Sequence, residues 1–164
     1  LAAKRLETLA ANLQRLGLEA QTVAADVAAW QPAETPAGVL LDAPCSATGT
    51  MRRHPDVAHL KRPGDVVRLA GLQARLLEAA VAMLGPGGVL VYCVCSLQPA
   101  EGPERVAALL ADHPELQRQP IAAAEVAGLS ELISPEGDLR TLPCHLAEQG
   151  GLDGFYAARL RRQG

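Results

Sequence analysis

Two cysteines stand where a strand-like apolar segment gives way to a loop, and a thiol in such a place can do chemistry. Cys45 comes shortly after the apolar run 38–42, and Cys95 comes directly after the run 89–94. A thiol reacts as its thiolate, which requires partial exposure and an electropositive setting. Cys95 is therefore a candidate nucleophile, with a small buried apolar side chain as the alternative.

The other two cysteines, Cys93 and Cys144, are expected to be small buried side chains, as free cysteines commonly are. The sequence contains no C-x-x-C pair, so neither a zinc site nor any other metal site is expected. The first residues resemble an amphipathic helix and not a secretory signal, and a chain of 164 residues needs no disulfide staples. We expect four free thiols in a cytoplasmic protein.

Charged residues near the ends of the apolar runs are the remaining candidates. Asp26 and Asp42 each stand at the exit of such a run. A dense basic cluster follows Cys45 and consists of Arg52, Arg53, His54, Lys61 and Arg62. This cluster could contact RNA phosphates, and solvated charge on a loop is the alternative. The glycine-rich residues 85–88 precede a strand instead of following one, so they predict a turn and not a phosphate-binding loop.

The spacing of apolar residues predicts alternating strands and helices. The predicted helices span 2–16, 65–84 and 101–112, and the predicted strands span 20–25, 38–42, 89–94, 139–142 and 155–160. Residues 115–138 give mixed signals. This alternation is typical of an α/β doubly wound sheet.

One β-α-β unit positions both candidate thiols. The strands 38–42 and 89–94, joined by the helix 65–84, should be parallel and close to each other. Ligands of open α/β sheets bind beyond the carboxyl ends of the strands. Cys45 and Cys95 should therefore face one crevice.

Composition limits what kinds of partner the chain can bind. The net charge is -3 and only 2% of the residues are aromatic, so neither a generally basic surface nor an aromatic platform for base stacking is expected. Any contact with RNA must therefore be local. No apolar run approaches the roughly 20 residues of a membrane span. We expect no membrane association.

Four motifs together resemble a known family of enzymes. The motifs occupy residues 41–49 (LDAPCSATG), 52–56 (RRHPD), 87–96 (GGVLVYCVCS) and 153–157 (DGFYA). They are similar to motifs of the RNA cytosine-5 methyltransferases, most of all the bacterial RsmB (Sun/Fmu) group, which acts on 16S ribosomal RNA. The resemblance implies a Rossmann-like class I methyltransferase sheet, S-adenosylmethionine as cofactor and ribosomal RNA as partner.

The resemblance also implies a task for each matched residue. The thiolate of Cys95 would add to carbon 6 of cytosine, so that carbon 5 can take a methyl group, and Cys45 would act in the release step. Asp42 would lie between the cofactor and the target base, and Asp26 would bind the adenosine moiety. The basic residues of the second motif, Arg52, Arg53 and His54, would contact RNA. The target base must be unstacked to reach such a site.

Some features of the family have no counterpart in this sequence. The first two strands, the glycine-rich cofactor loop and the RNA-binding amino-terminal domain are absent, so residues 1–164 are expected to be the carboxyl-terminal part of a catalytic domain. We expect this part to be monomeric and to bind S-adenosylmethionine weakly or not at all. A non-catalytic RNA- or partner-binding module is one alternative. Another is a cysteine hydrolase that pairs Cys95 with His54, His59 or His145.

Overall fold

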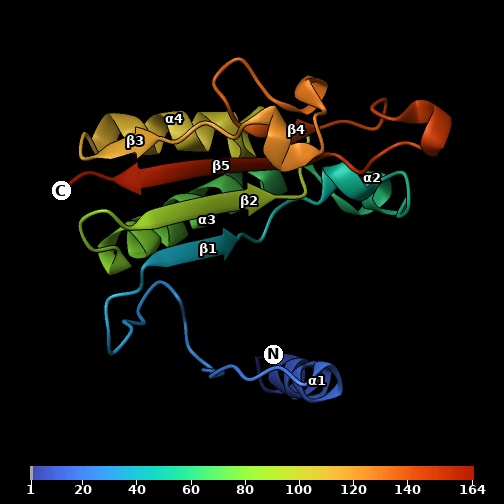
Figure 1. Cartoon of the computed structure of the whole chain (residues 1–164). Coiled ribbons are helices and arrows are strands. Elements are labelled where there is room, and N and C mark those ends of the chain that lie inside the picture. The colour runs from blue at the N-terminus through green and yellow to red at the C-terminus, as the bar shows by residue number, and fades with distance from the viewer. Residues whose placement is uncertain (1) are drawn as a thin grey trace. The chain divides into compact units, whose positions relative to one another are not determined.

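The computed structural model describes residues 2–164 and divides the chain into two compact units (Figure 1). The units are Leu1–Gln31 and Pro32–Gly164, and each is described by itself. None of the helices described is both long and apolar enough to cross a membrane.

The first unit contains the predicted amino-terminal helix, α1, Ala2–Leu16. The helix ends at Gly17, whose φ of 65° lies in the left-handed region that favours glycine. Beyond it, the N–H of Leu18 donates to the carbonyl of Leu13 at 3.0 Å, which closes the last turn. Both the helix and its glycine stop are confirmed.

The predicted strand 20–25 is wrong. Within the described part of the chain, the backbone groups of residues 19–25 form no hydrogen bonds to other backbone groups. A run of apolar residues gives a segment the capacity to pair, but a strand exists only where a neighbouring strand supplies the bonds. This segment therefore has no strand structure.

The second unit is built on a five-stranded mixed sheet. Its strands are β1 (Gly38–Asp42), β2 (Val89–Val94), β3 (Leu116–Arg118), β4 (Leu139–Thr141) and β5 (Phe155–Arg162). The order is β1-β2-β5-β3, and β4 also pairs with β5. β1 and β2 are parallel and adjacent, as the β-α-β prediction requires, whereas β5 runs antiparallel to β2.

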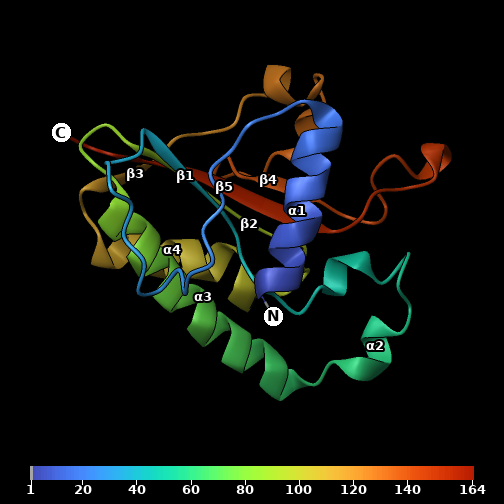
Figure 2. The ribbon, with the colours of Figure 1, turned by 90° about the horizontal axis from the view of Figure 1, so that it is seen from below.

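Helices cover one face of this sheet. They are α3 (Pro63–Met83) and α4 (Pro103–Asp112), and a short helix, α2 (Val57–Leu60), precedes α3. In Figure 2, α3 and α4 lie on the same side of the sheet. Alternate residues of β2, namely Leu90, Tyr92 and Val94, are fully buried in the core beneath them. Because strand side chains alternate between faces, this pattern fixes the face that α3 and α4 cover.

The connections contain several single turns of 3₁₀ helix. They are η1 (Thr48–Thr50), η2 (Pro99–Glu101), η3 (Ala123–Val126), η4 (Ser130–Leu132) and η5 (Ala147–Gln149). The glycine-rich residues 85–88 form the predicted turn, where Gly87 has a φ of 76°. α3 begins two residues earlier than predicted because Pro63 fits the first helical turn, where no N–H is needed.

Candidate active site

The two thiols singled out in the sequence meet at the carboxyl ends of β1 and β2. The sulfur atoms of Cys45 and Cys95 are 3.4 Å apart, which is a hydrogen-bond distance between thiols. Both cysteines are free and half-buried. The prediction that the two thiols lie close together is therefore confirmed.

Backbone pairing brings these loops together. Asp42 and Cys93 are the last paired residues of β1 and β2. Past that point, the N–H of Ala43 donates to the carbonyl of Cys93 at 3.0 Å, and the N–H of Gly49 donates to the carbonyl of Cys95 at 3.1 Å. The parallel register thus continues into the loops, and this continuation places the thiols side by side.

The contact makes the two thiols chemically unequal. The hydrogen bond from Cys45 lowers the pKa of Cys95 to about 7, although burial acts against this. The same contact, together with burial, raises the pKa of Cys45 far above its ordinary value. Near neutral pH, the thiolate form is therefore favoured on Cys95 over Cys45. The pair thus combines a more acidic thiol, Cys95, with a less acidic one, Cys45.

A buried carboxylate lies beneath the pair and was not found from the sequence. Glu101 is completely buried, and its two oxygen atoms accept four hydrogen bonds. Ser46 donates from its N–H at 2.8 Å and from its hydroxyl at 2.5 Å, and the hydroxyl of Ser96 donates at 2.5 Å. The fourth donor is the side-chain amide of Gln73, at 3.2 Å. The only sequence signal was a serine directly after each of the two cysteines.

Asp42 lies at the same strand edge, three residues before Cys45, and is exposed. The thiol of Cys93 donates to its Oδ1 at 3.8 Å. Burial, followed by the charge of Asp42, raises the pKa of Cys93 to about 11. Cys93 is therefore a buried and inert thiol, as predicted.

Cys144 and Asp26 are the two remaining candidates from the sequence. The prediction that Cys144 is buried is wrong: it is exposed in the loop between β4 and η5, outside the sheet. Asp26 belongs to the first unit, where its Oδ1 accepts a hydrogen bond from the N–H of Ala28 at 3.0 Å. Its assignment to the adenosine moiety stays a prediction.

The predicted basic cluster is divided into two parts. Arg53 donates from Nε to Asp153 at 2.7 Å, and Arg52 lies 3.6 Å from the same carboxylate. This contact with Arg53 lowers the pKa of Asp153. It also joins the motifs 52–56 and 153–157, which lie a hundred residues apart. His54 is exposed next to this ion pair, in the loop after η1.

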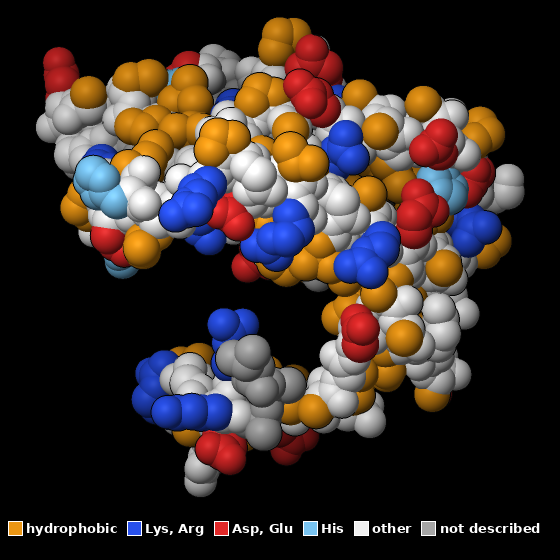
Figure 3. All heavy atoms as spheres, turned by 180° about the vertical axis from the view of Figure 1, so that it is seen from behind, with side chains coloured by type: hydrophobic (Ala, Val, Ile, Leu, Met, Phe, Trp, Pro, Cys, Tyr) orange, Lys and Arg blue, Asp and Glu red, His pale blue; other side chains and the backbone are white. Residues whose placement is uncertain are grey.

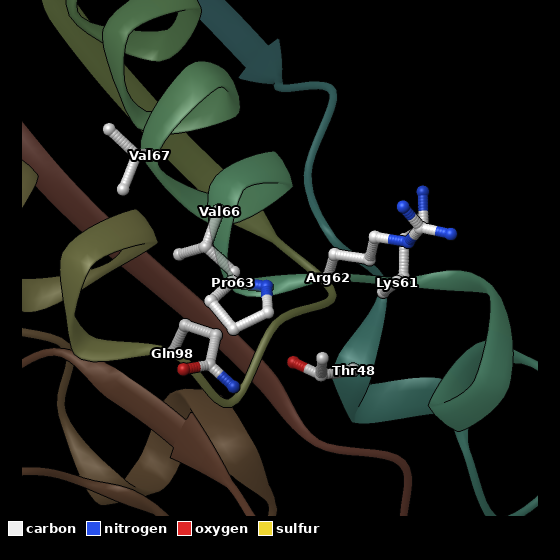
Figure 4. Close-up of a pocket in the computed structure, with 7 residues that line it drawn as sticks. All are labelled: Thr48, Lys61, Arg62, Pro63, Val66, Val67 and Gln98. Carbon is white, nitrogen blue, oxygen red and sulfur yellow. The ribbon is translucent and has the colours of Figure 1, made fainter.

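The second part of the cluster borders a cavity of about 360 Å³ at the start of α3 (Figure 4). The cavity is lined by Thr48, Lys61, Arg62, Pro63, Val66, Val67 and Gln98. In Figure 4 the charged end of Arg62 points away from Thr48 and Gln98. On the face of the second unit shown in Figure 3, basic side chains stand apart from one another among apolar and acidic ones. This face therefore has no continuous basic surface, in line with the net charge of -3.

Neither a metal centre nor a catalytic histidine lies at the thiols. In residues 2–164, the structure brings together no group of three histidine, cysteine or acidic side chains that could hold a metal ion. No histidine in the same range forms a hydrogen bond with Cys95, whose sulfur instead pairs with Cys45. The cysteine-hydrolase alternative therefore has no general base in this arrangement.

Comparisons with known proteins agree with this geometry. A family model described as "16S rRNA methyltransferase RsmB/F" matches residues 1–161. Ribosomal RNA small subunit methyltransferase B of Pseudomonas syringae pv. tomato is 43% identical over 163 residues, which are 98% of this chain and 35% of the relative. The chain thus spans about a third of the length of the curated relatives it matches.

Solved structures share the fold. The crystal structure of PH0851 superposes with a TM-score of 0.84 at 27% identity, over 98% of this chain and 35% of that one. NSun6 from Pyrococcus horikoshii, solved with SFG, gives a TM-score of 0.76 at 25% identity, over 99% of this chain and 40% of that one. These likenesses confirm the expected Rossmann-like methyltransferase sheet.

Proposed function

Because the chain belongs to the RsmB/F family of 16S rRNA methyltransferases, we propose that it carries the thiol part of an active site that methylates carbon 5 of a cytosine in ribosomal RNA. The observation that carries this proposal is the pair of unequal thiols, 3.4 Å apart. Residues 1–164 would form part of a methyltransferase domain in a monomeric, cytoplasmic protein.

In this proposal Cys95 is the nucleophile. Its thiolate adds to carbon 6 of the cytosine, and the displaced electron pair makes carbon 5 able to form a bond to a methyl group. When bound, S-adenosylmethionine supplies that methyl group. After the transfer, a base such as water takes the proton of carbon 5, its electron pair restores the double bond to carbon 6, and the thiolate of Cys95 leaves. The pKa of about 7 supports this role, because a thiolate must be available at neutral pH both to attack and to leave.

Cys45 would assist the release of the product. It keeps its proton, and its sulfur lies at hydrogen-bond distance from the sulfur that must leave carbon 6. A donor in this place stabilises the departing thiolate, because hydrogen bonds to a charged form favour that form. The lowered pKa of Cys95 and the raised pKa of Cys45 support the assignment of attack to Cys95 and release to Cys45.

Asp42 and Asp26 are the residues proposed to hold the cofactor. The exposed carboxylate of Asp42 lies three residues before Cys45 and is an acceptor suited to an amino group. A solved relative carries SFG, an analogue of S-adenosylmethionine, which supports the same cofactor for this family. Arg52, Arg53 and His54 are proposed to contact RNA phosphates next to the thiols. A non-catalytic module would have no use for a thiol of lowered pKa.

Methyl transfer by the full-length protein that contains these residues tests the proposal. With ribosomal RNA and labelled cofactor, Cys95→Ala should abolish both methylation and covalent attachment to RNA. Cys45→Ala should instead let the covalent adduct accumulate. Cys144→Ala, which removes an exposed thiol, is the matched control and should be fully active. Adduct accumulation in Cys95→Ala would exchange the two roles, and full activity in both variants would refute the thiol mechanism.

A further inference from the structure

We propose that Glu101 is a positioning residue, whose buried carboxylate ties together the loops of Cys45 and Cys95 and so holds the two sulfur atoms in contact. The consequence for methyl transfer rests on the proposed function, whereas the positioning itself does not. Glu101 touches neither sulfur in this arrangement and acts through the residues that follow each cysteine.

The carboxylate is hydrogen-bonded to the residue that directly follows each of the two cysteines. Ser46 holds it through a backbone and a side-chain donor, and Ser96 holds it through a hydroxyl group. Gln73, on α3, donates both to Glu101 at 3.2 Å and to the carbonyl of Pro44 at 2.9 Å. The residues on both sides of Cys45 are thus fixed relative to the residue after Cys95.

Glu101 is itself anchored to the core of the sheet. Its carbonyl accepts a hydrogen bond of 2.6 Å from the hydroxyl of Tyr92, which is fully buried in β2. Its N–H donates to the carbonyl of Gln98 at 3.1 Å, within the 3₁₀ turn η2. The backbone of Glu101 is therefore held in place, so that its carboxylate can hold the two loops.

The side chain of Glu101 suits its four hydrogen-bond donors in both charge and length. An ionised carboxylate accepts at both oxygen atoms and donates nothing, so it can satisfy four converging donors. Burial of such a charge is costly unless it is fully hydrogen-bonded, and here it is. Aspartate at this position would keep the charge but is one methylene group too short to reach both serines. Glutamine would keep the length, and its amide could still bond both hydroxyl groups.

Two variants therefore separate position from charge. Glu101→Asp should loosen the contact between the thiols, so the pKa of Cys95 should rise from about 7 toward its ordinary value of 9.0. Glu101→Gln should leave it near 7 or lower it, because the charge of Glu101 raises the pKa of Cys95. The other charged or titratable groups that interact with Cys95 are Cys45, Asp42, Cys93 and Arg53, and all four are unchanged in these variants.

The readout is the pH dependence of alkylation of Cys95 by iodoacetamide, followed by mass spectrometry on the full chain. At pH 7, Glu101→Asp should react about five- to tenfold more slowly, since the loss of thiolate outweighs the higher reactivity of a more basic one. In a Cys45→Ala background, Glu101→Asp should have no further effect. Asp138→Asn removes another buried carboxylate, on the segment before β4, and controls for lost stability.

Each result decides the inference. A Cys95 pKa that is unchanged in folded Glu101→Asp, or that shifts equally in Asp138→Asn, would overturn the positioning role. A pKa that falls in Glu101→Gln and stays constant in Glu101→Asp would mean that Glu101 acts by charge alone. The expected changes in the pKa of Cys95 would support the positioning role even if the full-length protein transferred no methyl group. A failure of methyl transfer would count against the proposed function only.

Discussion

The hydrogen bond between the two thiols should set the acidity of Cys95, and Cys45→Ala removes it. This bond is the largest cause of the lowered pKa of Cys95. In the variant, burial and the charges of Asp42 and Glu101 still raise the pKa, while a backbone hydrogen bond lowers it. The pKa should therefore return to about 9 or above.

The size of this effect follows from the two values. A rise of the Cys95 pKa from about 7 to about 9 corresponds to about 3 kcal/mol of lost thiolate stabilisation. The thiolate fraction at pH 7 would fall from about one half to about one in a hundred. Cys45→Ser, which keeps a shorter donor, should give a pKa between those of the wild type and Cys45→Ala.

The assay is the rate of alkylation of Cys95 between pH 5 and pH 10, measured peptide by peptide. The midpoint of the wild-type profile should lie near 7, and that of Cys45→Ala near 9. Cys144→Ala should reproduce the wild-type profile, because this thiol lies outside the site. A midpoint that stays near 7 in Cys45→Ala would refute the reasoning, since some other group would then have to stabilise the thiolate.

Three further predictions concern the charged surface and the cofactor. Arg53→Ala should leave the free energy of unfolding nearly unchanged, because the guanidinium group is largely exposed to solvent, while it should weaken the salt dependence of RNA binding by the full-length protein by about one phosphate contact. The matched variant Arg75→Ala should leave that salt slope unchanged, and an unchanged slope in both variants would remove Arg53 from the RNA interface. Glu115 and Glu78 raise the pKa of His113 above its unfolded value, so the stabilisation is complete below about pH 6.5 and is lost as pH rises through the folded pKa. In urea unfolding, the free energy of unfolding of the wild type should fall by less than about 1 kcal/mol over this pH range, and that of His113→Gln should not. Parallel pH profiles of the two proteins would contradict this prediction. Isothermal titration calorimetry of residues 1–164 should detect weak or no binding of S-adenosylmethionine, and a micromolar dissociation constant would contradict that expectation.

Much of the second unit could be predicted because local pattern and tertiary structure agree there. β2 is a continuous apolar run preceded by glycines, and an apolar stripe runs along α3, so the type of each element follows from its own residues. The connection between β1 and β2 through one helix then implies parallel neighbours. The proximity of Cys45 and Cys95 followed from this topology.

The errors arose where an element depends on a partner distant in sequence. Residues 20–25 have the composition of a strand, but composition cannot supply the neighbouring strand that makes one. Cys144 is apolar in type, yet its loop lies outside the sheet, so nothing covers it. The basic residues after Cys45 form one cluster in the sequence but two groups in the structure. The reason is that Arg52 and Arg53 pair with Asp153, whereas Lys61 and Arg62 do not.

The sequence by itself determined the β-α-β unit of the second unit and which thiols stand at its strand ends, because both follow from residue patterns along the chain. Only the tertiary structure decided the chemistry of those thiols. The unequal pKa values of Cys45 and Cys95 depend on a sulfur–sulfur contact across 50 residues of sequence. That contact depends in turn on Glu101, whose importance comes from four donors that converge on it from separate segments. Hydrogen bonds and burial act over a few ångströms in space, and sequence spacing does not record those distances.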